Sequence, residues 1–320
     1  MRLLVAAASV AVVLKASALA ADVDALSATV RAEDADRFVT IFEAANGAPS
    51  AEALTAGYIA PGSPGLKIFT PGRIENGERL AAVIASNQAE YRRAMDVCLP
   101  IAKASGNQLR AIYLALDGLL GDPALPEIYV LFGAGNSGGT AGPGAQVLGL
   151  EVLCRGDKDE AAIRALFRSF FAHETVHTLQ STERDGFFAK DTLLTAVLME
   201  GTADYIAFLV TGETPSPVRA SWGEARAAEI WKAFENDRRK SEKAPLEKRF
   251  TPGAPLYRWI ANAGSAPEGW PDELGYWLGM QIAAAYVDQA ADARAAIKEL
   301  LDLKDAALIL EKSGYAKRFD

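Results

Sequence analysis

The chain has 320 residues, half of them hydrophobic, with 33 basic and 41 acidic side chains and a formal net charge of −8 at pH 7. This hydrophobic share excludes an intrinsically disordered chain and is enough for a large core. The acidic balance argues against nucleic acid and against anionic membrane surfaces as partners.

The first 20 residues, MRLLVAAASVAVVLKASALA, have the pattern of a cleaved secretory signal. An apolar run follows Arg2 and ends at Lys15, short of the roughly 20 residues that span a bilayer, so we expect no stable membrane insertion after cleavage. The triplet ALA predicts cleavage after Ala20, and removal of the signal changes the formal charge from −8 to −10. No cysteine stands at the cleavage point, which argues against a lipoprotein. The sequence therefore predicts a bacterial protein that is periplasmic or secreted.

Only two cysteines occur in the chain, Cys98 and Cys154. Two are too few for a cysteine-based metal site. In an exported protein an even pair predicts one disulfide, with two separate buried thiols as the alternative.

The front of the chain has apolar residues at the helical spacings of three and four, as in RLAAVIASNQAEYRRAMDVCLPIAKA. Prolines and glycines in YIAPGSPGLKIFTPGRIENG, residues 58–77, forbid a continuous helix there. We therefore expect a helical first part that contains one long ordered loop or linker.

Two apolar runs, residues 128–132 and 146–153, predict strands joined by a glycine-rich loop. The segment GAGNSG in that loop matches a dinucleotide-binding fingerprint through Gly133, Gly135 and Gly138. That fingerprint requires that its glycines open a helix, whereas here a second strand follows. We interpret the segment as a flexible hairpin loop in a small antiparallel sheet.

Two long helices are predicted after the strands. The first covers residues 160–181, with Asp157 or Asp159 as its cap, and the second covers residues 192–210 and begins after Asp191.

A polar, charged stretch follows, and apolar helical spacing returns over residues 272–289. We expect a single domain over residues 21–320 that has three consecutive parts. They are a helical N-terminal part (21–125), a sheet and metal-site core (126–212) and a helical C-terminal part (213–320).

Both histidines of the chain lie in AHETVHTLQ, where His173, Glu174 and His177 form the motif H-E-x-x-H. On a helix, a spacing of four puts both imidazoles on one side, where each can give a nitrogen to one Zn²⁺, and the glutamate reaches toward a metal-bound water. A catalytic zinc takes a third protein ligand, and Glu200 on the next helix is the candidate. Two unpaired histidines on an apolar stripe would be costly, which favours a metal site over a core histidine pair.

Asp204 follows Glu200 by one helical turn, and this E-x-x-x-D spacing after H-E-x-x-H resembles the gluzincin metallopeptidases. In that group the aspartate accepts the second N–H of a histidine ligand, so the resemblance implies this role for Asp204. Thermolysin-like members use a further histidine to stabilise the oxyanion, and this chain has none left. Tyr276 or an arginine must replace it; we choose Tyr276, for which core packing is the alternative.

Five segments carry a wider resemblance, in the order IAPGSPGLKIFTPGRI, GAGNSGGTAG, AHETVHTLQ, MEGTADYIAF and GYWLGMQIAAAYV. They are similar to a bacterial family of predicted zinc-dependent proteases that is known as a domain of unknown function. The resemblance covers most of the mature chain. It implies a gluzincin-like fold with His173, His177 and Glu200 as zinc ligands and Glu174 as general base, and it implies no substrate.

The expected fold is α+β, mainly helical and zincin-like, with a small antiparallel sheet packed beside the H-E-x-x-H helix. In zincin-type sites an edge strand pairs with an extended peptide, and the resemblance gives that place to the strand that begins at Gln146, with Leu148 and Leu150 also facing the substrate. The expected partner is a peptide or protein substrate.

The expected function is that of an exported zinc metallopeptidase. Zinc would activate a water, Glu174 would accept its proton, and the resulting hydroxide would attack a peptide carbonyl. One alternative is a zinc hydrolase of a non-peptide amide. The other is a zinc-containing binding or envelope-assembly protein without turnover, and the sequence leaves the oligomeric state open.

Overall fold

The computed structural model describes residues 22–182 and 184–320, and these form two compact units. Residues 22–178 are here called the N-terminal unit and residues 179–320 the C-terminal unit. The predicted signal peptide and its cleavage site lie outside the described residues. The sequence predicts one domain, and nothing in its pattern marks a boundary at residue 178, which lies in the last turn of the helix Glu160–Leu179.

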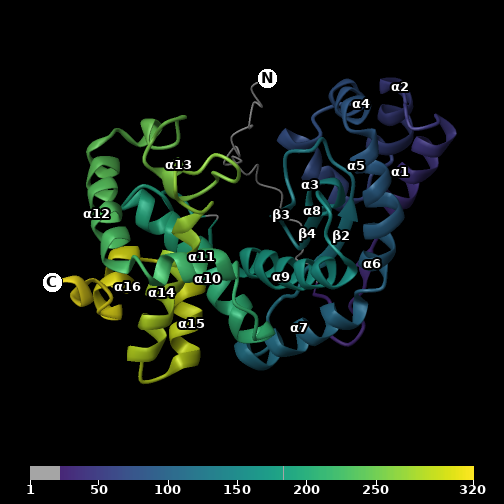
Figure 1. Ribbon diagram of the computed structural model, residues 1–320. Coiled ribbons are helices and arrows are strands. Elements are labelled where there is room, and N and C mark those ends of the chain that lie inside the picture. Colours follow the sequence, from purple (N-terminus) through teal and green to yellow (C-terminus); the bar gives the residue numbers. More distant parts are fainter. Residues whose placement is uncertain (1–21, 183) are drawn as a thin grey trace. The chain divides into compact units, whose positions relative to one another are not determined.

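The N-terminal unit consists of helices around a small sheet (Figure 1). Its strands are β1 (Val30–Arg31), β2 (Glu127–Leu131), β3 (Gly139–Gly142) and β4 (Ala145–Gly149). Its helices are α1 (Glu33–Ala44), α2 (Ala51–Leu54), α3 (Pro64–Arg73), α4 (Gly77–Ser86), α5 (Gln88–Arg93), α6 (Leu99–Lys103), α7 (Gly106–Leu120), α8 (Leu150–Leu153) and α9 (Glu160–Leu179), with π-helical turns η1 (Thr55–Ile59) and η2 (Ala94–Cys98).

The sheet is mixed, with strand order β1-β2-β4-β3. Strands β1 and β2, and β2 and β4, are parallel, whereas β3 and β4 are antiparallel. The mainly helical α+β class is confirmed, but the predicted antiparallel pairing of residues 128–132 with 146–153 is wrong. Parallel neighbours need a crossover of about a dozen residues, and the glycine-rich segment provides one while its own end, β3, forms the hairpin with β4.

The second predicted strand is also too long. Strand β4 ends at Gly149, and Leu150–Leu153 form the short helix α8. A short apolar run has no periodicity that separates a buried strand from a buried helix, which explains the error.

A helix forms inside the segment that the sequence predicts to be a loop. The Ser63 hydroxyl accepts a hydrogen bond from the Leu66 amide at 3.2 Å, and Pro64 occupies the first turn, where its missing N–H costs nothing. Pro71 and Gly72 leave the helical conformation, with Gly72 at φ 73°. The prolines and glycines therefore start and kink helix α3 instead of preventing it.

Buried side chains hold the start of the glycine-rich segment. The Tyr58 hydroxyl donates to the Phe132 carbonyl at 2.7 Å and accepts from the Phe132 amide at 3.0 Å. The Tyr91 hydroxyl donates to the Gly133 carbonyl at 2.6 Å, and the Glu151 carboxylate accepts from the Gly133 amide at 2.9 Å. These hydrogen bonds hold the segment as an ordered loop, and its interpretation as a flexible hairpin loop is wrong.

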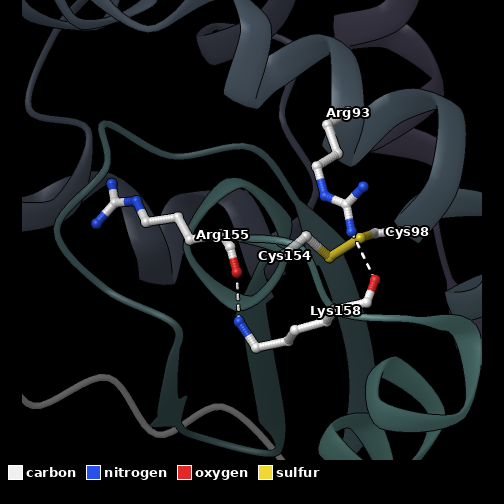
Figure 2. The surroundings of a disulfide bond; sticks show 5 residues. All are labelled: Arg93, Cys98, Cys154, Arg155 and Lys158. Atoms are coloured by element: carbon white, nitrogen blue, oxygen red, sulfur yellow. Dashed lines mark hydrogen bonds between the residues drawn. A yellow bond between two sulfur atoms is a disulfide. The ribbon is translucent and has the colours of Figure 1, made fainter.

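A disulfide joins Cys98 and Cys154, as the even cysteine count predicts (Figure 2). Cys98 ends η2, and Cys154 follows α8. The Arg93 guanidinium donates to the Lys158 carbonyl at 2.6 Å beside this bond, and the Lys158 ammonium donates to the Arg155 carbonyl. The helical front of the unit is therefore linked covalently to the loop that leads into α9.

The C-terminal unit is entirely helical over its described residues. Helices α10 and α14 pack against each other, and most of the others pack around them. The helices are α10 (Thr192–Thr211), α11 (Pro217–Glu224), α12 (Ala227–Lys243), α13 (Leu256–Trp259), α14 (Leu274–Gln289), α15 (Ala293–Asp302) and α16 (Ala306–Ser313), with 3₁₀ turns η3 (Leu246–Lys248) and η4 (Ala316–Phe319).

Helix α10 is long and apolar enough to span a membrane, but 78% of its most apolar window is buried inside the protein, as in a core helix. It ends at Gly212 in the left-handed conformation. Its first amides are capped from α12, because the Glu242 carboxylate accepts from the amides of Asp191 and Thr192, both at 3.1 Å. Asp191 itself pairs with Arg238, so its position before the helix was predicted correctly but its side chain is not the cap.

Candidate metal centre

Helix α9 carries both histidines and is positioned by the sheet. The Asp159 carboxylate accepts from the Ala162 amide at 2.8 Å, which confirms Asp159 as the cap. The Gln146 side chain of β4 donates to the Phe170 carbonyl at 2.7 Å and accepts from the Thr175 hydroxyl at 3.1 Å. These bonds fix the rotation of α9 about its own axis, and with it the direction of the histidine face.

The two histidines point at each other. Their ring centres are 4.7 Å apart and their Nε2 atoms 3.0 Å apart. Glu200, the third predicted ligand, belongs to the C-terminal unit, where it is buried on α10. Two imidazole nitrogens bound tetrahedrally to one zinc would be about 3.4 Å apart. The separation of the two histidine nitrogens is therefore close to the one that a shared zinc ion requires.

Glu174 lies against strand β3 of the same unit. A Cβ atom built on Gly139 would come within 2.9 Å of its Oε1 atom, so the carboxylate packs closely against the backbone of β3. The negative charge of Glu174 also raises the pKa of the Arg73 side chain. The residue predicted to act as a base thus lies at the edge of the sheet.

Asp204 lies one turn after Glu200 on α10, and its carboxylate accepts a hydrogen bond from Arg219 at 2.8 Å. The Arg219 guanidinium also lies over the Tyr276 ring, 5.0 Å from its centre. Asp204 and Tyr276 are therefore neighbours of one buried arginine that sequence reasoning missed. An isolated arginine in SPVRAS, in a different helix, carries no local signal of this contact.

The predicted substrate-facing residues do not face solvent. Gln146, Leu148 and Leu150 are all 0% exposed, and β4 has a neighbouring strand on each side. The prediction that β4 is the peptide-binding edge is wrong, because β3 forms within the glycine-rich segment and takes the edge position.

Residues 177–317 match a family profile, GldB_lipo, described as the gliding motility protein GldB. The matched segment includes His177, Glu200 and Asp204 and begins after His173 and Glu174. No curated protein and no solved structure matches the chain. The profile represents lipoproteins of the cell envelope, which agrees with the predicted export of this chain.

This match contradicts the assignment to a zinc-dependent protease family, the gluzincin metallopeptidase function and the description of the chain as a hydrolase. The physical reason is that H-E-x-x-H spacing specifies how a helix presents ligands to a metal and carries no information on turnover. The catalytic roles predicted for Glu174 and Tyr276 depend on the peptidase function, so they lose their support as well.

Proposed function

We propose that this protein is a non-enzymatic, exported component of the bacterial cell envelope that acts in surface motility or envelope assembly through contacts with other proteins. The match of residues 177–317 to the gliding motility family carries this proposal. The matched segment contains α10 and α14, the core of the C-terminal unit. The envelope-assembly alternative derived from the sequence is therefore preferred to the enzyme.

We also propose that His173, His177 and Glu200 hold a structural Zn²⁺. The support is the donor set: the two imidazoles of α9, with Nε2 atoms 3.0 Å apart, and the buried carboxylate of Glu200, which together make a candidate metal-binding group. A metal there would link residues far apart in the sequence, and its binding free energy would add to that of folding. In this proposal the N-terminal unit is a zincin-like scaffold, with a sheet beside the histidine helix, that has no peptidase chemistry.

Metal analysis of the purified mature chain tests the zinc site. We expect about one zinc per chain, as three protein ligands imply. Glu200→Ala should abolish binding, and Asp204→Asn should weaken it by about 10 to 100-fold if Asp204 orients a histidine ligand. Glu229→Ala is the control, because Glu229 is an exposed acid of the same unit. Full zinc occupancy in Glu200→Ala would refute the ligand assignment.

Complementation separates a binding role from catalysis. The gene would be deleted in its own bacterium, and surface spreading would be scored after return of the wild type, of Glu200→Ala or of Glu174→Gln. We expect Glu174→Gln to restore spreading fully, because the variant keeps the three proposed ligands and no proton transfer is needed. Loss of a general base would cost about 100 to 10,000-fold in rate. A folded, zinc-loaded Glu174→Gln protein that fails to complement would refute the non-enzymatic proposal.

A further inference from the structure

Arg73 lies where the end of α3 contacts the glycine-rich loop of the N-terminal unit. It follows the kink at Pro71 and Gly72, and its carbonyl accepts from the Ala134 amide at 3.1 Å. The Asn136 side chain donates to the Gly72 carbonyl at 2.9 Å. The end of α3 is therefore fixed against the ordered glycine-rich loop, and the backbone of Arg73 has a defined position.

Within the described residues, the Arg73 side chain has defined contacts but forms no ion pair with a carboxylate. Its Nε donates to the Ser137 hydroxyl at 3.3 Å, and its guanidinium carbon lies 5.8 Å from the centre of the Phe69 ring. Among residues 22–182 and 184–320, no carboxylate lies within 4.0 Å of it, and its two terminal nitrogens donate no hydrogen bond.

Three arginines of the C-terminal unit provide the contrast. Arg219 and Arg249 are buried and Arg238 is partly buried, and each forms an ion pair with a carboxylate. A charge removed from water needs such a partner, because its burial is otherwise costly. Arg73 is half-buried and lacks one within the described chain.

The electrostatic surroundings of Arg73 point to a weakly charged anion. Burial lowers the pKa of Arg73, and the negative charge of Glu174 opposes that shift. The guanidinium stays protonated at any physiological pH. Glu174 attracts this cation from beyond hydrogen-bonding distance, and it would repel a dianion such as phosphate more strongly than a carboxylate.

We propose that Arg73, supported by Ser137 beside the glycine-rich loop, is a binding site for a carboxylate of a protein partner. The planar guanidinium offers two parallel N–H groups that match a carboxylate in a bidentate contact. The carboxylate belongs either to an aspartate or glutamate side chain or to a chain terminus. This site rests on the proposed role in protein contacts, but it requires no metal.

Fluorescence anisotropy with labelled peptides and the full mature chain tests the site. Three peptide pools would be compared: one rich in glutamate with an amidated end, one without acids but with a free terminal carboxylate, and one without either carboxylate. We expect one of the first two pools to bind and the third to bind at least tenfold more weakly. The pool that binds identifies the source of the carboxylate.

Substitutions then assign the binding to Arg73. Arg73→Gln should weaken the preferred pool by about 10 to 100-fold, the range for a hydrogen bond to a charged group, and Arg73→Lys should weaken it less. Arg79→Gln is the matched control, because Arg79 is a half-buried arginine of the same unit that already pairs with Glu75. Thermal unfolding would establish that each variant is folded.

Absence of binding by both carboxylate pools, equal binding of all three pools, or undiminished binding by folded Arg73→Gln would each overturn the site. The measurement would be repeated on Glu200→Ala. Binding that depends on Arg73 should persist there, so failure of the zinc proposal and failure of this site give different results.

Discussion

Arg219 and Asp204 form a buried ion pair in the C-terminal unit, with Arg219 Nη2 donating to Asp204 Oδ2 at 2.8 Å and only 8% and 6% of the two side chains exposed. Asp204 is on the same stripe of α10 as Glu200, which is also buried. An acidic stripe in a core helix needs a compensating cation. Arg219, from α11, provides the cation for Asp204, which lies one helical turn after the candidate metal ligand Glu200.

Removal of the Arg219 cation should destabilise the C-terminal unit. Arg219→Met leaves Asp204 charged and buried, and we expect the free energy of unfolding to fall by about 3 to 5 kcal/mol. Urea unfolding followed by tryptophan fluorescence measures it, because all five tryptophans lie in the C-terminal unit. Arg239→Gln removes an exposed arginine of the same unit and should change stability by less than about 0.5 kcal/mol. Equal stability of the two variants would contradict a buried pair.

Helices α10 and α14 approach each other through glycine. A Cβ atom on Gly279 would lie 1.9 Å from the Val197 carbonyl oxygen, and one on Gly201 would lie 2.3 Å from the Gly279 Cα. Gly279→Ala should therefore force the helices apart and destabilise the C-terminal unit by about 3 kcal/mol or more, at the upper end for overpacking.

The control for this prediction is Gly118→Ala in α7, where an added Cβ meets no atom within 4 Å. Alanine is a better helix former than glycine by about 1 kcal/mol, so this variant should be slightly stabilised. Circular dichroism and tryptophan fluorescence of both variants would be compared. A Gly279→Ala protein as stable as the wild type would contradict this close approach of the two helices.

The sequence predicted the long helices well because their signals are local. Asp159 and Gly212 mark helix ends through their own conformational preferences, and the spacing of His173 and His177 needs only one helix to bring them together.

Features that depend on contacts between distant segments were not predictable. The parallel pairing of β2 with β4 depends on where the loop places β3, and the surroundings of Arg73 depend on a loop more than 60 residues later. The match of residues 177–317 to a motility family illustrates the same limit for function, since a motif that presents metal ligands does not specify their use.

The disulfide should contribute most of its effect to the N-terminal unit. Cys98 and Cys154 are 56 residues apart, and closure of a loop of that length adds about 4 kcal/mol on the chain-entropy model. In the double variant Cys98→Ser, Cys154→Ser the unfolding free energy of the N-terminal unit should fall by that amount. Amide hydrogen exchange in α5 to α8 measures it. The tryptophan transition of the C-terminal unit is the internal reference. Two titratable thiols in denatured, unreduced wild type would contradict the bond.

Glu151 should make the N-terminal unit less stable as the pH rises. Burial raises the pKa of Glu151 above its ordinary value of 4.5, while hydrogen bonds from the Gly133 and Gly135 amides and the charge of Arg155 oppose the shift. Between the ordinary and the raised pKa, the folded protein binds more protons at this site than the unfolded chain. Stability from this group is therefore present below pH 4.5 and is lost as the pH rises through the raised pKa.

The neutral variant Glu151→Gln isolates this effect, because it removes the titration and leaves the other groups in place. The difference in unfolding free energy, wild type minus variant, should decrease as the pH rises from 4.5 through the raised pKa of Glu151. Hydrogen exchange of the Gly133 to Gly138 amides and urea unfolding of the N-terminal unit would give this difference at each pH. Glu78→Gln, which removes an exposed acid of the same unit, is the control and should show no such trend. A difference that grows with pH would mean that the two backbone donors outweigh the burial of the charge, so that the loop is held by an ionised carboxylate.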